Sequence, residues 1–385
     1  MASIVVVGAG IFGLTAAWEL GRRGWSVDVI DPGPVPRSEA ASTDISKVIR
    51  MDYGADDFHT ALAEAALEGW DRWNTEWGVL YHEDGFLLLA GAPMRDGGFE
   101  HESLHALARR GHRVDRLSPS IVAQRFPAWS HAAYADGYFN PRAGWAESGR
   151  VVARVAKAAA DAGVRLRENV RCGELIDAGS RVVGVQTNDR ELRADAVLIA
   201  AGAWTPWILP ELAGVMWTTG QPVVHFDAGT SPRWRAPQFP VWGADIAQTG
   251  WYGFPALPDG TLKIGHHGTG RRVHPDDERT VTASEVDRFR GFLLSNLPAL
   301  ADAPIRSKRL CLYCDTFDGD FWIDHHPDRP GLIVAAGDSG HGFKFAPVFG
   351  GIIADIVERT PNKWAHRFRW RRRDQDRTEA ARARA

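Results

Sequence analysis

The feature that most restricts the fold of this chain is a glycine-rich turn close to its start. Residues 4–7 (Ile-Val-Val-Val) form a continuous apolar run, as expected for a strand that is buried on both faces. Residues 8–13 (Gly-Ala-Gly-Ile-Phe-Gly) follow at once and open a segment with helical periodicity. In such a turn the first glycine allows the tight bend, the second lets the backbone approach a pyrophosphate, and the third lets the helix pack closely on the strand. The pattern therefore predicts a strand–turn–helix unit that binds a dinucleotide.

A second strand and an acidic residue complete this unit. Residues 27–31 read as a strand that ends in Asp31, 18 positions after Gly13, where a carboxylate can accept hydrogen bonds from ribose hydroxyls. The amino end of the helix offers free N–H groups and a partial positive charge to the phosphates. The unit alone does not distinguish NAD from FAD.

Two further buried strands end at glycine, at residues 196–202 and 331–337. A sheet built from all three strands would make the nucleotide-binding domain discontinuous. A chain of 385 residues also exceeds the usual size of one hydrophobic core. We therefore expect an α/β protein whose cofactor domain comprises residues 1–80, 146–215 and 306–385. Residues 81–145 and 216–305 are expected to form a second, antiparallel-sheet substrate domain.

Helical spacing of apolar residues predicts four more helices, at residues 55–77, 149–162, 283–296 and 345–358. The tail from Arg367 onward is basic and rich in alanine, and we expect it to be solvated or frayed.

Charge and cysteine content restrict the partners. A net charge of −3 gives no reason to expect nucleic acid or an anionic membrane surface. No apolar run approaches the length that spans a bilayer, and the first strand is not preceded by a signal-peptide pattern. Three cysteines (Cys172, Cys311 and Cys314) cannot make a disulfide framework, so a reducing cytoplasm is expected. A monomer or a small homo-oligomer is the expected assembly.

Several motifs in the second half of the chain, together with Arg50, carry a family resemblance. They are Cys311-Leu-Tyr-Cys-Asp-Thr316, Asp324-His-His-Pro327, Ala335-Ala-Gly-Asp-Ser-Gly-His-Gly-Phe-Lys344, Tyr252-Gly-Phe-Pro255 and Lys263-Ile-Gly-His-His267. In their order along the chain these motifs resemble the monomeric sarcosine oxidase family of the D-amino-acid-oxidase-like superfamily, whose relatives include N-methyltryptophan, fructosyl-amino-acid and saccharopine or pipecolate oxidases. The resemblance covers nearly the whole chain.

The resemblance implies FAD as the cofactor, in a Rossmann-like domain with an inserted antiparallel-sheet substrate domain. It implies oxidation of the C–N bond of an amino-acid-like secondary amine to an imine, which water hydrolyses. It further implies that O₂ is reduced to hydrogen peroxide.

Cys311 matches the cysteine that bonds covalently to the flavin 8α-methyl group. The alternative is a C-x-x-C dithiol formed with Cys314. Residues 309–315 read as a strand, on which side chains three positions apart point to opposite faces, so the flavin link is favoured. Tyr313 shares the face of Cys311.

The resemblance also assigns the substrate site. Lys344 and Arg50 match the pair that holds the substrate carboxylate, which suits an arginine fork and an ammonium. For Arg50 the alternative is a surface ion pair with Asp52. Lys263 matches the lysine that activates oxygen, where a fixed cation stabilises developing superoxide. On its strand Lys263 could instead face solvent. His267 and Tyr252 match residues that line the substrate side of the flavin.

The cofactor contacts implied by the turn and by the resemblance form one set. They are Gly8, Gly10, Ile11, Phe12, Gly13, Asp31, Ser42, Thr43, Lys47, Val170, Gly202, Trp204, Cys311, Gly337, Gly340, His341, Gly342, Phe343 and Lys344. The helix that begins near Phe345 should direct its positive end at the flavin and stabilise the anionic reduced form. Adjacent histidines on a strand face opposite ways, so neither His266-His267 nor His325-His326 predicts a metal site.

Two positions depart from the sarcosine oxidase pattern. Lys47, three residues after Asp44, stands where sarcosine oxidase has arginine near the flavin, and this spacing looks more like the fructosyl-amino-acid and saccharopine oxidases. Gly243 replaces a methionine over the substrate, which should enlarge the pocket. A bulkier N-substituted or cyclic amino acid is therefore as well supported as sarcosine. The alternatives are a flavin dehydrogenase with another acceptor, a nicotinamide dehydrogenase and a non-catalytic flavin-binding protein.

Overall fold

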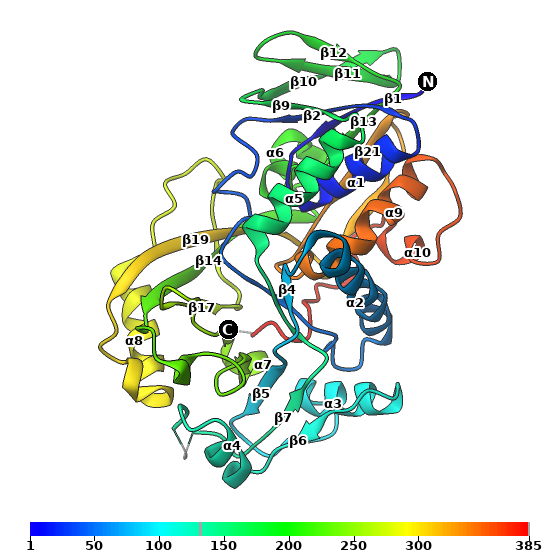
Figure 1. Cartoon of the computed structure of the whole chain (residues 1–385). Helices are drawn as coiled ribbons and strands as arrows, with labels where there is room; N and C mark the ends of the chain where they lie inside the picture. Colours follow the sequence, from blue (N-terminus) through cyan, green and yellow to red (C-terminus); the bar gives the residue numbers. More distant parts are fainter. Residues whose placement is uncertain (131–132, 384–385) are drawn as a thin grey trace.

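The computed structural model describes residues 1–130 and 133–383. Its first sheet has the strand order β20-β21-β13-β1-β2-β9, and every neighbouring pair is parallel except β20 with β21 (Figure 1). The three strands that end at glycine therefore lie side by side, as predicted. The strands of this sheet are β1 (Ser3–Val7), β2 (Ser26–Asp31), β9 (Arg165–Glu168), β13 (Ala196–Ile199), β20 (Trp322–His325) and β21 (Leu332–Ala336).

Both faces of this sheet are covered, which explains the uninterrupted apolar run in β1. Ile4 and Val6 pack into a core with helices on one face, whereas Val5 and Val7 pack with residues of a small three-stranded sheet on the other. Helix α1 packs against α5 and α9 on the helical face (Figure 1). The elements are α1 (Ile11–Arg22), α2 (Asp57–Trp77), α5 (Ser148–Asp161), α9 (Ala346–Val357), β10 (Cys172–Ala178), β11 (Arg181–Thr187) and β12 (Glu191–Arg193).

A second, mainly antiparallel sheet forms the other half of the molecule (Figure 1). Its strands run in the order β18-β14-β17-β16-β15-β5-β7-β6, and β19 pairs with β14 along nearly its whole length. They are β5 (Phe86–Ala90), β6 (Asp115–Arg116), β7 (Asp136–Asn140), β14 (Met216–Asp227), β15 (Val241–Ala244), β16 (Trp251–Gly253), β17 (Thr261–His266), β18 (Arg271–Arg272) and β19 (Ile305–Thr316). These strands come from the two segments predicted for the substrate domain, with β19 added; the domain boundaries themselves stay a prediction.

Helix α8 (Ala283–Asn296), predicted at the same residues, packs Phe289 and Phe292 against this sheet. A small sheet of β3 (Lys47–Ile49), β8 (Gly144–Ala146) and β4 (Tyr81–His82) lies where the chain passes between the halves. The remaining helices are α3 (Phe99–Arg109), α4 (Pro119–Arg125), α6 (Thr205–Ile208), α7 (Ile246–Thr249) and α10 (Ala365–Phe368). Of the helices formed by described residues, none has the length and apolar character needed to cross a bilayer.

The end of the chain differs from its prediction. Residues 372–378 are exposed, as expected, but Ala381, Arg382 and Ala383 are buried. This segment returns to the second sheet, and in Figure 1 it ends beside α7 and β17. The expectation of a frayed terminus was wrong because Arg382 makes two hydrogen bonds to the buried Asp315, at 2.6 and 2.7 Å.

Candidate active site

A cavity of about 270 Å³ lies at the carboxyl ends of β1, β2, β13 and β21. Ligands of open parallel sheets bind at this carboxyl edge. Thirteen residues predicted to contact the cofactor line it: Gly8, Gly10, Ile11, Phe12, Asp31, Ser42, Lys47, Val170, Gly202, Trp204, Gly340, Gly342 and Phe343.

The glycine turn has the shape that a dinucleotide requires. Gly8 has φ +107°, and a Cβ there would lie 2.5 Å from the carbonyl oxygen of Ala200. A Cβ on Gly13 would overlap the carbonyl of Gly8, so neither position tolerates a side chain. At the amino end of α1 the N–H of Ile11 donates to Ser42 Oγ at 3.0 Å, which shows that this helix end accommodates an oxygen acceptor. These features fit the pyrophosphate of FAD.

Asp31 holds the turn as well as lining the cavity. Its carboxylate accepts hydrogen bonds from the N–H groups of Ala9 at 2.9 Å and Gly33 at 3.1 Å. Burial raises the pKa of Asp31, and these two hydrogen bonds oppose the shift.

The other predicted cofactor residues lie elsewhere. Gly13 packs α1 on β1, and Gly337 ends β21 with its Cβ position against Thr316. The carbonyl of Thr43 accepts from Arg309. Cys311 packs with Val223 and Tyr313, and His341 and Lys344 line a second cavity.

That second cavity has a volume of about 70 Å³. Ten predicted residues line it: Lys47, Arg50, Tyr252, Lys263, His267, Tyr313, Gly340, His341, Phe343 and Lys344. The two cavities adjoin, because Lys47, Tyr313, Gly340 and Phe343 line both. The residues that the sequence predicts for the active site therefore lie together beside the larger cavity: Lys47, Arg50, Tyr252, Lys263, His267, Tyr313 and Lys344. Sequence reasoning missed Val48, Phe86, Ile246, Phe254 and Glu379.

Lys263 is fully buried, so the alternative of a solvent-facing lysine was wrong. Its ammonium lies 2.6 Å from Asp44 Oδ2, and it donates to the carbonyl of Ser46 at 2.6 Å. Burial lowers the pKa of Lys263 to about 8, although Asp44 opposes the shift. Burial raises the carboxyl pKa of Asp44, but Lys263, together with His225, Lys47 and Arg309, outweighs this effect and holds the pKa well below its usual range.

Arg50 is also buried, and its partner is not the expected one. Asp52 accepts hydrogen bonds from Tyr138 at 2.6 Å and Asn140 at 3.1 Å, so the surface ion pair with Arg50 was wrong. The guanidinium Nη2 of Arg50 instead donates to Glu379 Oε1 at 2.6 Å. His267 Nε2 lies 2.9 Å from the other oxygen of Glu379.

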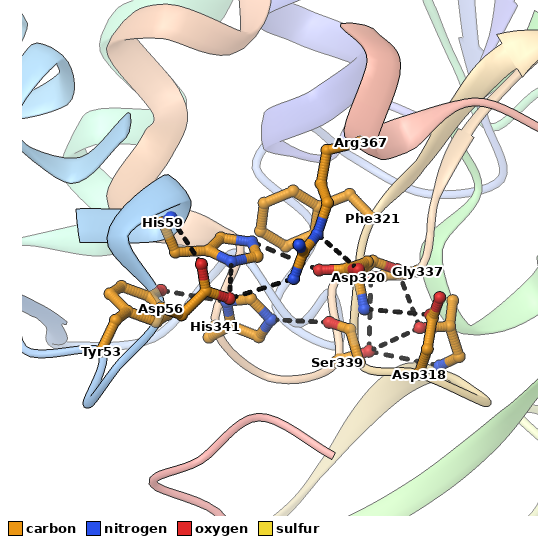
Figure 2. Close-up of polar contacts among 12 residues, drawn as sticks. Tyr53, Asp56, His59, Asp318, Asp320, Phe321, Gly337, Ser339, His341 and Arg367 are labelled. Carbon is orange, nitrogen blue, oxygen red and sulfur yellow. Dashed lines mark hydrogen bonds and ion pairs between the residues drawn. The ribbon is translucent and has the colours of Figure 1, made fainter. Parts of the chain in front are cut away.

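Lys344 is positioned by a short chain of hydrogen bonds. Its ammonium donates to the hydroxyl of Tyr53 at 2.9 Å and to the carbonyl of His341 at 2.8 Å. The Tyr53 hydroxyl lies 3.0 Å from His341 Nδ1 (Figure 2). His341 Nε2 lies 2.9 Å from the carbonyl oxygen of Gly319. Burial, together with nearby Arg50, holds the pKa of Lys344 well below its usual range.

Figure 2 shows a wider polar network behind Tyr53 and His341. Asp56, His59 and Asp320 place three potential ligand atoms within 4.8 Å of one another. The guanidinium of Arg367 contacts Asp56 at 3.1 Å and Asp320 at 2.7 Å, so it already supplies a positive charge to both carboxylates. This network attaches the segment after α9 to α2.

The two cysteines of the C-x-x-C sequence have separate surroundings. Cys314 Sγ lies 3.9 Å from the sulfur of Met216, in the core behind the parallel sheet. Cys311 Sγ lies 4.0 Å from the ammonium of Lys47, which lines both cavities. Both thiols are free, as the divergence of their side chains on β19 predicted.

Gly243 does not enlarge the substrate cavity. A Cβ at this position would lie 3.2 Å from Phe86 Cζ and 3.4 Å from Ile246 Cβ, and these two side chains line the cavity. The expectation of a larger pocket at Gly243 was therefore wrong, because its neighbours fill the space.

A parallel sheet with a dinucleotide turn, beside a cavity lined by buried lysines and an arginine, defines the class of nucleotide-cofactor oxidoreductases. The model of the FAD dependent oxidoreductase family (DAO) matches residues 3–356. The chain belongs to this family.

The relatives agree with that assignment. Monomeric sarcosine oxidase of Bacillus sp. (strain B-0618) is 26% identical over 360 residues, which cover 92% of this chain and 91% of the relative. L-saccharopine oxidase of Schizosaccharomyces pombe is 30% identical over 413 residues, covering 97% and 94%. The solved structure of Aspergillus fumigatus fructosamine oxidase (Amadoriase II) in complex with FSA has a TM-score of 0.84 at 26% identity, covering 100% of this chain and 94% of that one.

Proposed function

We propose that this FAD-dependent oxidoreductase is an oxidase of a secondary-amine amino acid, either N-substituted or cyclic. One observation carries the proposal: the two cavities adjoin, and Arg50, Lys344 and Lys263 line the smaller one. The relatives named as sarcosine and saccharopine oxidases support this substrate class.

In the proposed reaction the substrate's C–N bond loses two electrons and two protons to become an imine, which water hydrolyses. O₂ takes up two electrons and two protons and becomes hydrogen peroxide. FAD supplies the two-electron acceptor that links these half-reactions. Arg50 and Lys344 hold the substrate carboxylate and so fix the carbon next to nitrogen beside the cofactor. No strong general base is required if the amine binds uncharged.

Lys263 is proposed to act in the oxygen half-reaction. Superoxide forms when the first electron reaches O₂, and an ammonium held in a buried site stabilises that anion without reorganising. Asp44 and Ser46 fix the position of this ammonium.

Covalent attachment of the flavin through Cys311 is the finer part of the proposal. The support is that Cys311 lies beside Lys47, at 4.0 Å, and next to Tyr313 in the same packing cluster, and both neighbours line the cofactor cavity. A cytoplasmic location is also proposed, on the basis of three free cysteines.

The deciding experiment is anaerobic bleaching of the flavin by a panel of N-methyl, N-fructosyl, cyclic and N-carboxyalkyl amino acids. At least one should bleach the flavin, and readmitted air should restore the colour with one hydrogen peroxide per turnover. A protein that none of these amines reduces would contradict the proposal. If an amine reduces the flavin but air forms no peroxide, the protein is a dehydrogenase with another acceptor.

A further inference from the structure

The segment of residues 378–383 enters the substrate cavity from outside the family core. It lies beyond residues 3–356, which match the family model, and follows a run of exposed residues, 372–378. Arg382 anchors it through two hydrogen bonds to Asp315, and the N–H of Ala383 donates to the carbonyl of His267 at 3.0 Å. Glu379, on the same segment, lines the cavity itself.

The surroundings of Glu379 are those of a bound carboxylate ligand. One of its oxygens accepts from Arg50 at 2.6 Å, the other lies 2.9 Å from His267 Nε2, and its side chain is only 4% exposed. Burial opposes its ionisation, but Arg50 and His267 hold the pKa of Glu379 well below its usual range. The carboxylate is therefore charged and fully engaged.

We propose that residues 378–383 are a displaceable plug, and that the carboxylate of Glu379 occupies, at Arg50, part of the subsite where Arg50 and Lys344 hold the substrate's carboxylate. The inference rests on the proposed function in one respect, namely that Arg50 binds the substrate carboxylate. Substrate and plug then exclude each other, because two carboxylates cannot share Nη2 of Arg50 and would repel each other in a buried site.

The plug occupies only one of the two terminal nitrogens of the Arg50 guanidinium. Nη1 of Arg50 is buried and has no hydrogen-bond partner among the described residues. Glu379 thus engages one arm of the guanidinium, whereas a planar fork can hold a carboxylate with both arms. A substrate that replaces Glu379 can use Nη1 as well, and this gives it an advantage over the tethered glutamate.

A tethered competitor weakens substrate binding in a predictable way. A short flexible tether keeps the competing group at an effective concentration of roughly millimolar. The apparent Kd for any carboxylate equals the intrinsic Kd divided by the fraction of molecules in which the site is open. Removing the charge of Glu379 should therefore strengthen the binding of an external carboxylate.

The test is a titration of the full-length holoenzyme with acetate, followed by the change in flavin absorbance. Glu379→Gln keeps the shape of the side chain and should lower the Kd of acetate about tenfold or more, the order expected when a charge-assisted hydrogen bond is weakened. Asp374→Asn is the matched control, since Asp374 belongs to the exposed run that precedes the plug. It makes the same charge change and should bind acetate like the wild type.

Hydrogen exchange gives a second readout that does not depend on turnover. Saturating acetate should increase deuterium uptake in the peptide that spans residues 374–383 of the wild type. A chain ending at Arg377 should bind acetate at least as tightly as Glu379→Gln, and this variant tests the proposal even if Glu379→Gln does not fold.

Weaker acetate binding in either variant, or unchanged exchange in the wild type, would show that the segment is a fixed wall and would overturn the proposal. Failure of the proposed function has a different signature, because acetate would then bind but no amine would bleach the flavin.

Discussion

Asp44→Asn is expected to shift the pH dependence of the reaction with oxygen. In the wild type the Asp44 carboxylate lies 2.6 Å from the Lys263 ammonium, and both side chains are at most 2% exposed. The carboxylate raises the pKa of Lys263 against the opposite effect of burial, which leaves it at about 8. Asparagine keeps the shape and an acceptor oxygen but removes the charge. The substitution therefore acts on the protonation of Lys263 rather than on its position.

The size of the shift follows from the strength of the ion pair. A charge-assisted hydrogen bond contributes about 1.5–3 kcal/mol, and one pKa unit corresponds to about 1.4 kcal/mol. The pKa of Lys263 should therefore fall by about one to two units in the variant. At about pH 7.5 the protonated fraction then drops roughly threefold to twenty-fivefold, whereas at about pH 5.5 Lys263 stays mostly protonated in both proteins.

The assay isolates the oxygen half-reaction. The enzyme is reduced with dithionite and mixed rapidly with oxygenated buffer, and the returning flavin absorbance gives the rate at each pH. Asp44→Asn should be slow at about pH 7.5 and should approach the wild-type rate at about pH 5.5. Lys263→Met, the control, should be slow at every pH. If Asp44→Asn were slowed equally at both pH values, the carboxylate would not act through the charge of Lys263.

Three further predictions test other parts of the site. Tyr53→Phe removes the hydroxyl that accepts from Lys344 and should raise KM for the substrate roughly fivefold with little change in kcat; an unchanged KM would mean that Tyr53 does not position the lysine. Cys311→Ser should release the flavin into the supernatant after acid denaturation, whereas Cys314→Ser should keep it on the chain; a yellow Cys311→Ser pellet would refute the link. Gly8→Ala should purify without flavin because its Cβ meets Ala200. Gly24→Ala controls for backbone strain and should stay yellow, because Gly24 also has a positive φ, +87°, but no atom lies within 4 Å of its Cβ. Flavin retained by Gly8→Ala would contradict the assignment of the turn.

The cofactor half of the site could be predicted from the sequence because it is built mainly from backbone. A tight approach of main chain to a ligand requires glycine at fixed spacing, and the three strand-to-glycine segments became the neighbours β21, β13 and β1. Helix α2 likewise begins after Asp56, whose side chain accepts from the N–H of His59. Glycine turns and helix caps are specified by neighbouring residues, so they form in the same way whatever the surrounding fold.

The substrate half depends on side chains that come from distant parts of the chain. Alternation could not decide which way Lys263 faces, because its neighbours Leu262 and Ile264 are buried as well. Arg50 and Glu379 are 329 positions apart, and no pattern near either residue indicates the pair. The basic, alanine-rich composition of the last residues is that of a solvated tail, but ion pairs with distant residues, Arg382 with Asp315 and Glu379 with Arg50, bring it inside.

The loop of residues 40–46 contacts both the glycine turn of the cofactor half and Lys263 of the substrate half. Ser42 accepts from the first N–H of α1 at the phosphate-binding turn, and four residues later the carbonyl of Ser46 accepts from Lys263. Asp44, between them, carries the counter-charge of Lys263, and Arg309 of β19 holds the loop through the carbonyls of Ala40 and Thr43. One short loop therefore contacts both the amino end of α1 and the ammonium of Lys263. A displacement of this loop would therefore move Asp44, the counter-charge of Lys263, together with Ser42 at the amino end of α1.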